Sequence, residues 1–188
     1  MLKKIIIIGA TSLILTACQD TENQNPNNED VNTPKTTQQD KSIDLSKTTV
    51  SLSDAVGVFL AAHPNTQIYS VELDSNWGKL EYEIKALDSS KEYEMRIDAE
   101  TKKVLSDKNE VENEMKGSLD FAAIVEPADA LKVASEQPQV KGMSPISWDL
   151  EFDDGVQLYK IKYKENSNKT EVGVNALTGE LLGVEIDD

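Results

Sequence analysis

The sequence predicts an α+β fold made of two copies of one module, each a helix packed on one face of a three- or four-stranded antiparallel sheet. The first observation is an internal repeat, because residues 70–105 align without a gap with residues 147–182, at an offset of 77 positions. The second is that each copy places a segment of helical periodicity before segments in which apolar and charged residues alternate. Such alternation is typical of an antiparallel sheet with one face buried under a helix. The residues that recur are Leu73/Leu150, Gly78/Gly155, Tyr82/Tyr159, Ile84/Ile161, Lys85/Lys162, Ala99/Ala176, Thr101/Thr178 and Leu105/Leu182.

The N-terminal segment has the layout of an export signal. Two lysines precede an uncharged apolar run, Ile5–Leu15, which is too short to span a bilayer as a permanent helix. The run ends in Leu15-Thr16-Ala17-Cys18, with small residues directly before the only cysteine of the chain. This motif resembles the lipobox of bacterial lipoproteins. The resemblance implies a signal peptide over residues 1–17, cleavage before Cys18 and a diacylglyceryl group on the Cys18 thiol.

Lipidation of Cys18 predicts a protein held on the cell membrane by lipid and facing outside the cytoplasm. Two acyl chains anchor a protein stably, whereas a single chain binds only marginally. The membrane is therefore the first expected partner, reached through the lipid on Cys18. With this thiol acylated, none remains for a disulfide, a zinc site or a nucleophile.

Acidic residues dominate the charge of the chain. The net charge is −15, and removing Lys3 and Lys4 with the signal takes the mature chain to −17. Such a charge repels nucleic acid and anionic lipid, so no nucleic-acid partner is expected. The acids are spread along the chain, which is typical of a solvated surface rather than of a dedicated cation store.

Residues 18–49 are predicted to be the lipidated cysteine followed by a disordered tether. Beyond Cys18 this segment is rich in Asn, Gln, Thr, Asp and Lys and has almost no apolar residues. It cannot bury enough surface to offset the entropy of ordering. A flexible chain of about 30 residues has a root-mean-square span of about 30 Å. The tether is therefore expected to lift the folded part off the membrane.

The first module is predicted over residues 50–110. Ser51-Leu52-Ser53-Asp54 has the pattern of a capping box with Ser51 as the N-cap. Apolar residues then recur at helical spacing as far as His63-Pro64, where the helix is expected to end. Two strands follow, in which apolar and charged residues alternate. Their apolar residues are Leu80, Tyr82 and Ile84 in one strand and Tyr93, Met95 and Ile97 in the next.

The second module is predicted over residues 119–188. Pro127 suits the first position of its helix, and Pro138 is expected to end it. Residues 106–120 are predicted to be a charged connector. Modules of this size are marginally stable alone, so the two copies are expected to pack on each other. The apolar residues predicted to lie on its strands are Tyr159, Ile161, Tyr163, Val172 and Val174.

Each module ends in a segment that resembles the strand-turn-strand signature of PepSY domains. The two segments are Ile97–Leu105, with the sequence IDAETKKVL, and Val174–Leu182, with the sequence VNALTGELL. Asp98 or Asn175 is expected to hydrogen-bond its own backbone in this turn, and glycine to supply a positive φ in the second copy. The first copy departs from the family pattern, because it has Lys102 where glycine is usual.

The resemblance covers about residues 50–188 and implies a regulatory protein. PepSY modules occur in the propeptides of secreted metallopeptidases and in exported or membrane proteins, and the family is proposed to regulate or inhibit peptidases. No catalytic residue of the family carries over. The predicted function is that of a membrane-anchored PepSY lipoprotein that binds or inhibits an exported peptidase or another envelope protein. The alternative is a structural or cation-binding acidic lipoprotein of the envelope.

The residue pattern does not favour an enzyme, and no cofactor or metal site is predicted. His63, the only histidine, precedes a proline at a predicted helix end, and no serine lies in a nucleophile motif such as Gly-x-Ser-x-Gly. Asp153-Asp154-Gly155 contains paired carboxylates, but Asp-Gly favours a hairpin turn. Trp77 and Trp148 are expected to pack in the core or on the sheet. A hydrolase remains a third possibility, which turnover abolished by His63→Ala would support.

Overall fold

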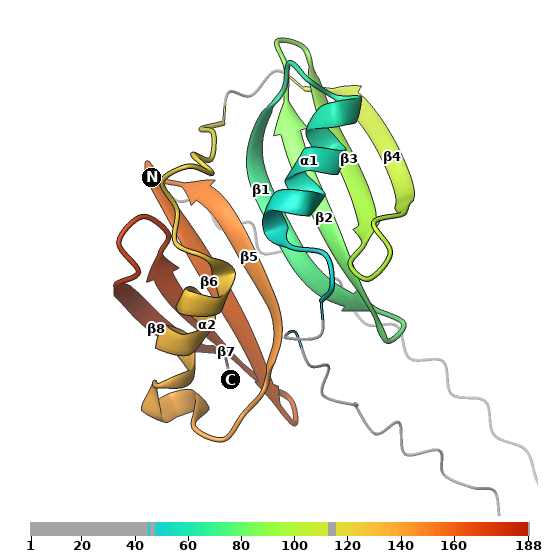
Figure 1. The fold of residues 1–188 in the computed structure, drawn as a ribbon. Coiled ribbons are helices and arrows are strands. Elements are labelled where there is room, and N and C mark those ends of the chain that lie inside the picture. The colour runs from blue at the N-terminus through green and yellow to red at the C-terminus, as the bar shows by residue number, and fades with distance from the viewer. Residues whose placement is uncertain (1–44, 46–47, 113–115, 188) are drawn as a thin grey trace, which may run out of the picture. The chain divides into compact units, whose positions relative to one another are not determined.

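The computed structural model describes residue 45 and residues 48–112 and 116–187 (Figure 1). The predicted signal peptide, Cys18 and most of the predicted tether lie outside these residues. Leu45 is 5% exposed and belongs to the hydrophobic core, so the folded part begins inside the segment predicted as tether. None of the described helices is long and apolar enough to cross a membrane.

Each module contributes one α-helix followed by four strands, and the α+β class is confirmed. The first module contains α1 (Leu52–Ala62), β1 (Gln67–Asn76), β2 (Lys79–Leu87), β3 (Lys91–Asp98) and β4 (Val104–Val111). The second contains α2 (Pro127–Ser135), the short 3-10 helix η2 (Pro138–Val140), β5 (Pro145–Asp153), β6 (Val156–Glu165), β7 (Asn168–Asn175) and β8 (Leu181–Asp187). Because β4 extends to Val111, the first part of the predicted connector 106–120 is a strand.

The eight strands form one continuous antiparallel sheet, which corrects the prediction of a separate sheet in each module. The strand order is β4-β3-β2-β1-β5-β6-β7-β8, and both helices lie on the same face (Figure 1). The join is the antiparallel pairing of β1 with β5, from Ser70–Glu151 to Leu73–Trp148. In a lone module β1 would be an edge strand with unpaired backbone groups, and β5 supplies the missing partner.

The register of this join is symmetric. Glu72 lies opposite Asp149, its own counterpart at the repeat offset of 77. The pairs on either side are Val71–Leu150 and Leu73–Trp148. At the same offset, Val71 corresponds to Trp148 and Leu73 to Leu150, so replacing each residue by its counterpart turns one pair into the other. A local two-fold axis therefore passes through the Glu72–Asp149 pair and relates the two modules.

The start of both helices and the end of α1 form where the sequence predicts. The Ser51 hydroxyl accepts a hydrogen bond from the Asp54 amide at 3.1 Å, and the Asp54 carboxylate accepts one from the Ser51 amide at 3.4 Å. These bonds satisfy two amides that α1 would otherwise leave unpaired. The helix ends at the C-cap His63, and Pro127 is the first residue of α2.

The signature turns have the same geometry in both modules. The Asp98 carboxylate accepts hydrogen bonds from the amides of Glu100 and Thr101, at 3.0 and 2.8 Å. Its counterpart Asn175 accepts two equivalent bonds, at 2.9 and 3.0 Å. Lys102 adopts a φ of 62° where Gly179 has 73°, so the turn forms even without the usual glycine.

The core lies between the sheet and the helices and is built from the predicted apolar faces. Two buried tyrosines hold the segments that lead into the helices: the Tyr82 hydroxyl donates to the Val50 carbonyl at 2.9 Å and the Tyr159 hydroxyl to the Val125 carbonyl at 2.8 Å. The largest fully buried side chains are those of Trp148, Tyr159, Tyr163, Phe59, Leu73, Ile84, Met95, Ile97, Leu150, Ile161, Val50 and Val71.

Candidate functional site

The face of the sheet opposite the helices is covered with charged side chains, and we call it the charged face. It is formed by the residues that alternate with the buried apolar residues along the central strands. Its members are Glu72, Asp74, Glu81, Glu83, Lys85, Glu92, Glu94, Arg96, Asp149, Glu151, Asp153, Lys160, Lys162 and Glu171.

A carboxyl pair lies at the centre of the charged face, on the two-fold axis. Burial, together with the neighbouring charge of Asp149, raises the pKa of Glu72 to about 7, although Lys162 acts in the opposite direction. The Lys162 ammonium lies 2.6 Å from Asp149 and 3.9 Å from Glu72. Burial lowers the pKa of Lys162, but the hydrogen bond and charge of Asp149, together with the charges of Glu72 and Glu171, outweigh it, so the net shift is upward. With a pKa of about 7, the Glu72 carboxyl keeps its proton up to near neutral pH, beside the Lys162 ammonium.

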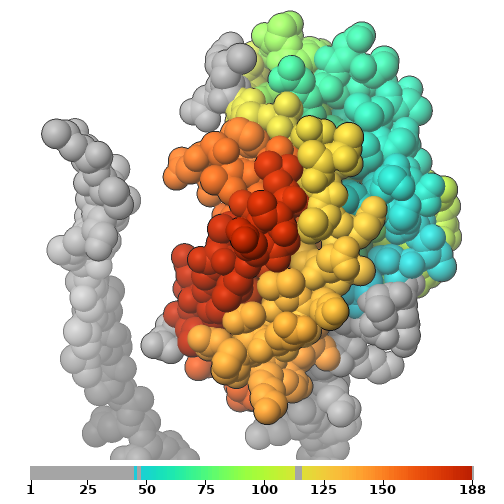
Figure 2. Space-filling model, turned by 60° about the vertical axis from the view of Figure 1, so that its left-hand side comes forward, coloured from blue at the N-terminus to red at the C-terminus, as the bar shows by residue number. Residues whose placement is uncertain are grey.

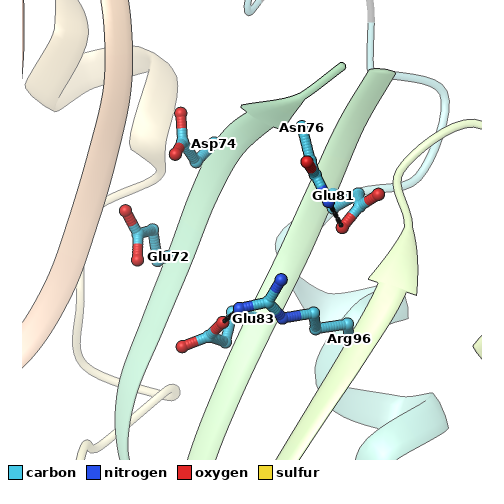
Figure 3. Close-up of a pocket in the computed structure, with 6 residues that line it drawn as sticks. All are labelled: Glu72, Asp74, Asn76, Glu81, Glu83 and Arg96. Carbon is cyan, nitrogen blue, oxygen red and sulfur yellow. Dashed lines mark hydrogen bonds and ion pairs between the residues drawn. The ribbon is translucent and has the colours of Figure 1, made fainter. Parts of the chain in front are cut away.

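A shallow depression adjoins this pair on the first module (Figure 3). Arg96 binds the Glu83 carboxylate at 2.5 Å and lies 3.8 Å from Glu94, and Asn76 donates to Glu81 at 3.4 Å. Burial opposes ionisation of Glu83, but Lys85 and Arg96 lower its pKa below the usual value. The depression is lined by Glu72, Asp74, Asn76, Glu81, Glu83 and Arg96. Although the buried Arg96 Nε makes no hydrogen bond among the described residues, the ion pair of Arg96 with Glu83 and the Asn76–Glu81 bond are typical of a structural polar network.

His63 lies at the end of α1. Among the described residues, its side chain contacts Asp107, Phe59 and Tyr93 rather than a serine. Its Nε2 lies 3.0 Å from the Asp107 carboxylate, and its ring packs against Phe59 and Tyr93, with centroids 5.1 and 4.5 Å away. The side chain is 15% exposed, so the residue is more buried than a surface histidine. These contacts give it a packing role between α1 and the edge of the sheet. Among the described residues, no group of three or more His, Cys, Asp or Glu side chains could hold a metal ion.

An apolar groove lies on the opposite face of the molecule, between α1 and the segment that leads into α2. In Figure 2 this segment (yellow) runs against α1 (cyan). Leu60, expected to lie on the buried stripe of α1, is 37% exposed at the groove. The groove is lined by Leu52, Ser53, Val56, Gly57, Leu60, Phe121, Ile124, Val125 and Glu126. Its mainly apolar lining suits contact with apolar side chains of another protein.

The two tryptophans differ from each other, and one prediction about them is wrong. Trp148 is 2% exposed and packs edge-on against Tyr82 and Tyr159, as expected for a core residue. Trp77 is 98% exposed at the tip of the β1–β2 hairpin and packs neither in the core nor on the sheet. Asp154 and Gly155 have φ of 47° and 84°, so the predicted hairpin turn is confirmed.

Sequence reasoning missed the Glu72–Asp149 pair, although the repeat contained the signal. Both residues occupy the same column of the 77-residue offset, each in the middle of the first strand of its module. When these two strands pair about a two-fold axis, the residues of that column lie opposite each other. The composition alone could not reveal this, because the chain has many other carboxylates.

Comparisons with known proteins found a matching family and a similar solved structure. The chain matches the family described as PepSY, "Peptidase propeptide and YPEB domain", over residues 49–108 and again over residues 124–185. No curated protein matches it. It is also similar to the crystal structure of a "putative lipoprotein" from Clostridium difficile 630, with 28% sequence identity and a TM-score of 0.69. The similarity covers 77% of this chain and 99% of that one.

Proposed function

Since the chain belongs to the PepSY family and carries its domain twice, we propose that it is a non-catalytic lipoprotein that binds and regulates an exported peptidase or another envelope protein. The observation that carries the proposal is the double family match, over residues 49–108 and 124–185. PepSY domains are generally regulatory modules without catalytic residues of their own. The described residues add two surfaces suited to contact rather than reaction, the charged face and the groove beside α1.

The location follows from the N-terminal motif and is supported by the similar structure. Leu15-Thr16-Ala17-Cys18 has the residue types of a lipobox, and the similar protein from Clostridium difficile carries the name of a lipoprotein. A diacylglyceryl group on Cys18 is sufficient for stable anchoring without a membrane-spanning helix. The protein then works at the outer side of the cell membrane, where exported peptidases are found.

Capture from envelope extracts tests the regulatory role, with the full mature chain as bait. Leu60→Glu puts a charge into the groove at a half-exposed position, so the fold is expected to tolerate it. The matched control is Leu182→Glu, the same change at a position that is 52% exposed on β8. Capture of a secreted peptidase that Leu60→Glu reduces at least tenfold and Leu182→Glu leaves intact supports the proposal. Capture of no envelope protein, with no effect on peptidase activity, contradicts it.

The anchor has a separate test in the mass of the N-terminal peptide. The wild-type protein is expected to lack residues 1–17 and to carry at least a diacylglyceryl group on Cys18. Cys18→Ala is expected to block both the modification and the cleavage. A mature N-terminus elsewhere, or a free Cys18 thiol on secreted protein, contradicts lipidation.

The mature net charge of −17 motivates one alternative, a structural or cation-binding lipoprotein of the envelope. Calorimetric titration with calcium separates the two functions. Saturable binding tighter than millimolar supports the alternative, whereas the absence of binding heat leaves cation binding without support. The pairing of charged-face carboxylates with lysine and arginine favours the second outcome.

A further inference from the structure

Trp77 occupies a position that the fold does not require to be tryptophan. It is 98% exposed, and together with Gly78 it forms the two-residue turn between β1 and β2. Both residues have positive φ, 52° and 81°, as in the type I′ turns that favour Asn-Gly and Asp-Gly. The equivalent turn of the second module is Asp154-Gly155, which follows that preference. A large aromatic side chain in this backbone region is an outlier, and such outliers point to function.

The hairpin tip lies at the same end of the first module as the segment that leads into α1. The Val50 amide donates to the Ala99 carbonyl at 3.0 Å, and the Ala99 amide donates to the Leu80 carbonyl at 3.0 Å. Leu80 is only three residues beyond Trp77. Figure 1 shows the start of α1 and the β1–β2 tip at this same end. Val50, which leads into α1, therefore lies at the same end of the first module as Trp77.

The charges around this end do not exclude a lipid surface. Lys79 follows the turn directly, and Lys102 and Lys103 lie in the neighbouring β3–β4 turn. All three are exposed, although Lys102 also pairs with Asp54 at 2.8 Å. Acidic residues such as Asp74, Asp98 and Glu100 lie at the same end, so the lysines offset the negative charge there only in part, and membrane contact depends on the ring of Trp77.

We propose that Trp77 is a second membrane contact, which inserts into the headgroup region of the same bilayer that holds the lipid on Cys18. Tryptophan favours this interface because its ring is apolar while its indole N–H can remain hydrogen-bonded. One tryptophan binds a membrane only weakly, but covalent attachment to an anchored lipid raises the local concentration of the bilayer. This inference rests on the proposed anchor and replaces the expectation that the tether holds the folded part off the membrane. In the proposed contact the β1–β2 end faces the bilayer, and the opposite end of β1 faces away from it.

Fluorescence of the lipidated full-length protein in phosphatidylcholine and phosphatidylglycerol vesicles tests the contact. Trp148 is 2% exposed in the core, so it supplies a constant background. Vesicles with brominated acyl chains are expected to quench the Trp77 component, and the bilayer to protect it from iodide. Trp77→Asn removes that component without changing the charge and suits the turn, so it is expected to fold and to lose all bromolipid quenching.

The outcomes distinguish this contact from the anchor and from a protein partner. Flotation with vesicles and the mass of Cys18 report the anchor alone, and Trp77→Asn is expected to change neither. A protein that floats but shows equal emission with plain and brominated lipid, and full iodide access, overturns the membrane contact. If Trp77 becomes protected only in a captured protein complex, the tryptophan belongs to a protein interface and the proposal is wrong.

Discussion

At the scale of single residues, two tyrosines at equivalent positions perform the same task in both modules. Tyr82 and Tyr159 each lie on the second strand of a module and donate to a carbonyl just before the helix. Tyr163, four residues beyond Tyr159 on β6, is also buried, but its hydroxyl has no hydrogen-bond partner among the described residues. Burial raises the pKa of Tyr82 and of Tyr163 to about 12, so both hydroxyls stay protonated.

This difference predicts opposite results for one substitution. Tyr82→Phe and Tyr159→Phe each leave a buried carbonyl unpaired and are expected to lower the free energy of unfolding by about 1–2 kcal/mol. Tyr163→Phe removes a hydroxyl that makes no such bond, and it is expected to be neutral or slightly stabilising. Urea unfolding of the three variants measures this. Equal losses in all three would show that the two hydroxyl bonds do not matter.

The carboxyl pair on the two-fold axis predicts a pH dependence. The pKa of Glu72 is about 7 in the folded chain against an ordinary 4.5, so the folded state binds the proton more tightly. Stability from this group is complete below about pH 4.5 and is lost as the pH rises through 7. Because Glu72 is partly exposed, the loss is expected to be on the order of 1 kcal/mol.

Glu72→Gln is expected to remove this loss and to raise stability at pH 8 relative to wild type. The comparison is urea unfolding at pH 5 and pH 8. Glu81→Gln, on the neighbouring strand of the charged face, is the control and is expected to keep the wild-type difference between the two pH values. The same pH difference in Glu72→Gln and in wild type would place the titrating group elsewhere.

At the scale of elements, the segment between β4 and α2 is positioned by a glycine. Gly117 lies against the ring of Phe152 on β5, and a Cβ at this position would overlap that ring. Two residues later, the Leu119 amide donates to the Ile68 carbonyl at 2.8 Å, which ties the segment to β1. The crossing between modules therefore depends on a close approach of backbone to an aromatic side chain.

Gly117→Ala is expected to destabilise the protein by about 1–3 kcal/mol, because the ring must move from its place. Gly57→Ala is the matched control. Gly57 is exposed inside α1 with open space around it, so alanine there is expected to stabilise by about 0.5–1 kcal/mol. Thermal unfolding followed by circular dichroism distinguishes the two signs. A stabilising effect of Gly117→Ala would show that the Phe152 ring can move aside without a cost in stability.

Elements whose signals are local could be predicted from the sequence, and those that depend on distant partners could not. The Ser51 capping box and the Asp98 and Asn175 turns depend on bonds within three residues, and all formed as predicted. The exposure of Trp77 was missed because large aromatic residues are usually buried. Its alignment with Asp154, in an Asp-Gly turn, was the available signal. The β1–β5 join depends on residues 77 positions apart, and strand patterns do not specify which edge pairs with which.

At the scale of the whole described chain, the join makes each module dependent on the other. Residues 48–112 alone would expose the β1 edge, and residues 116–187 alone would expose β5 with Trp148. Each separate module is therefore expected to melt well below the joined protein. A loss of about 2 kcal/mol lowers the Tm of such a small domain by roughly 8–16 °C.

The separate modules are also expected to self-associate, because β1 can pair with a second β1 around the same two-fold axis. That pairing brings two copies of Glu72 together, so dimers of residues 48–112 are expected to weaken from pH 5 to pH 8. Sedimentation at several concentrations measures the association, and the joined chain over residues 48–187 is the monomeric control. Monomeric modules with unchanged melting would contradict a stabilising role for the join.

The symmetric join gives this protein the geometry of a homodimer whose two subunits share one polypeptide. In a homodimer every substitution occurs twice, once at each end, whereas fusion lets either half diverge alone. The chain has used that freedom, because the counterparts of Trp77, Arg96 and Lys102 are Asp154, Gly173 and Gly179. The two halves therefore share one backbone arrangement but carry different side chains at equivalent positions. A binding partner meets one unique site in one orientation, so its complex should have a stoichiometry of one to one instead of two to one.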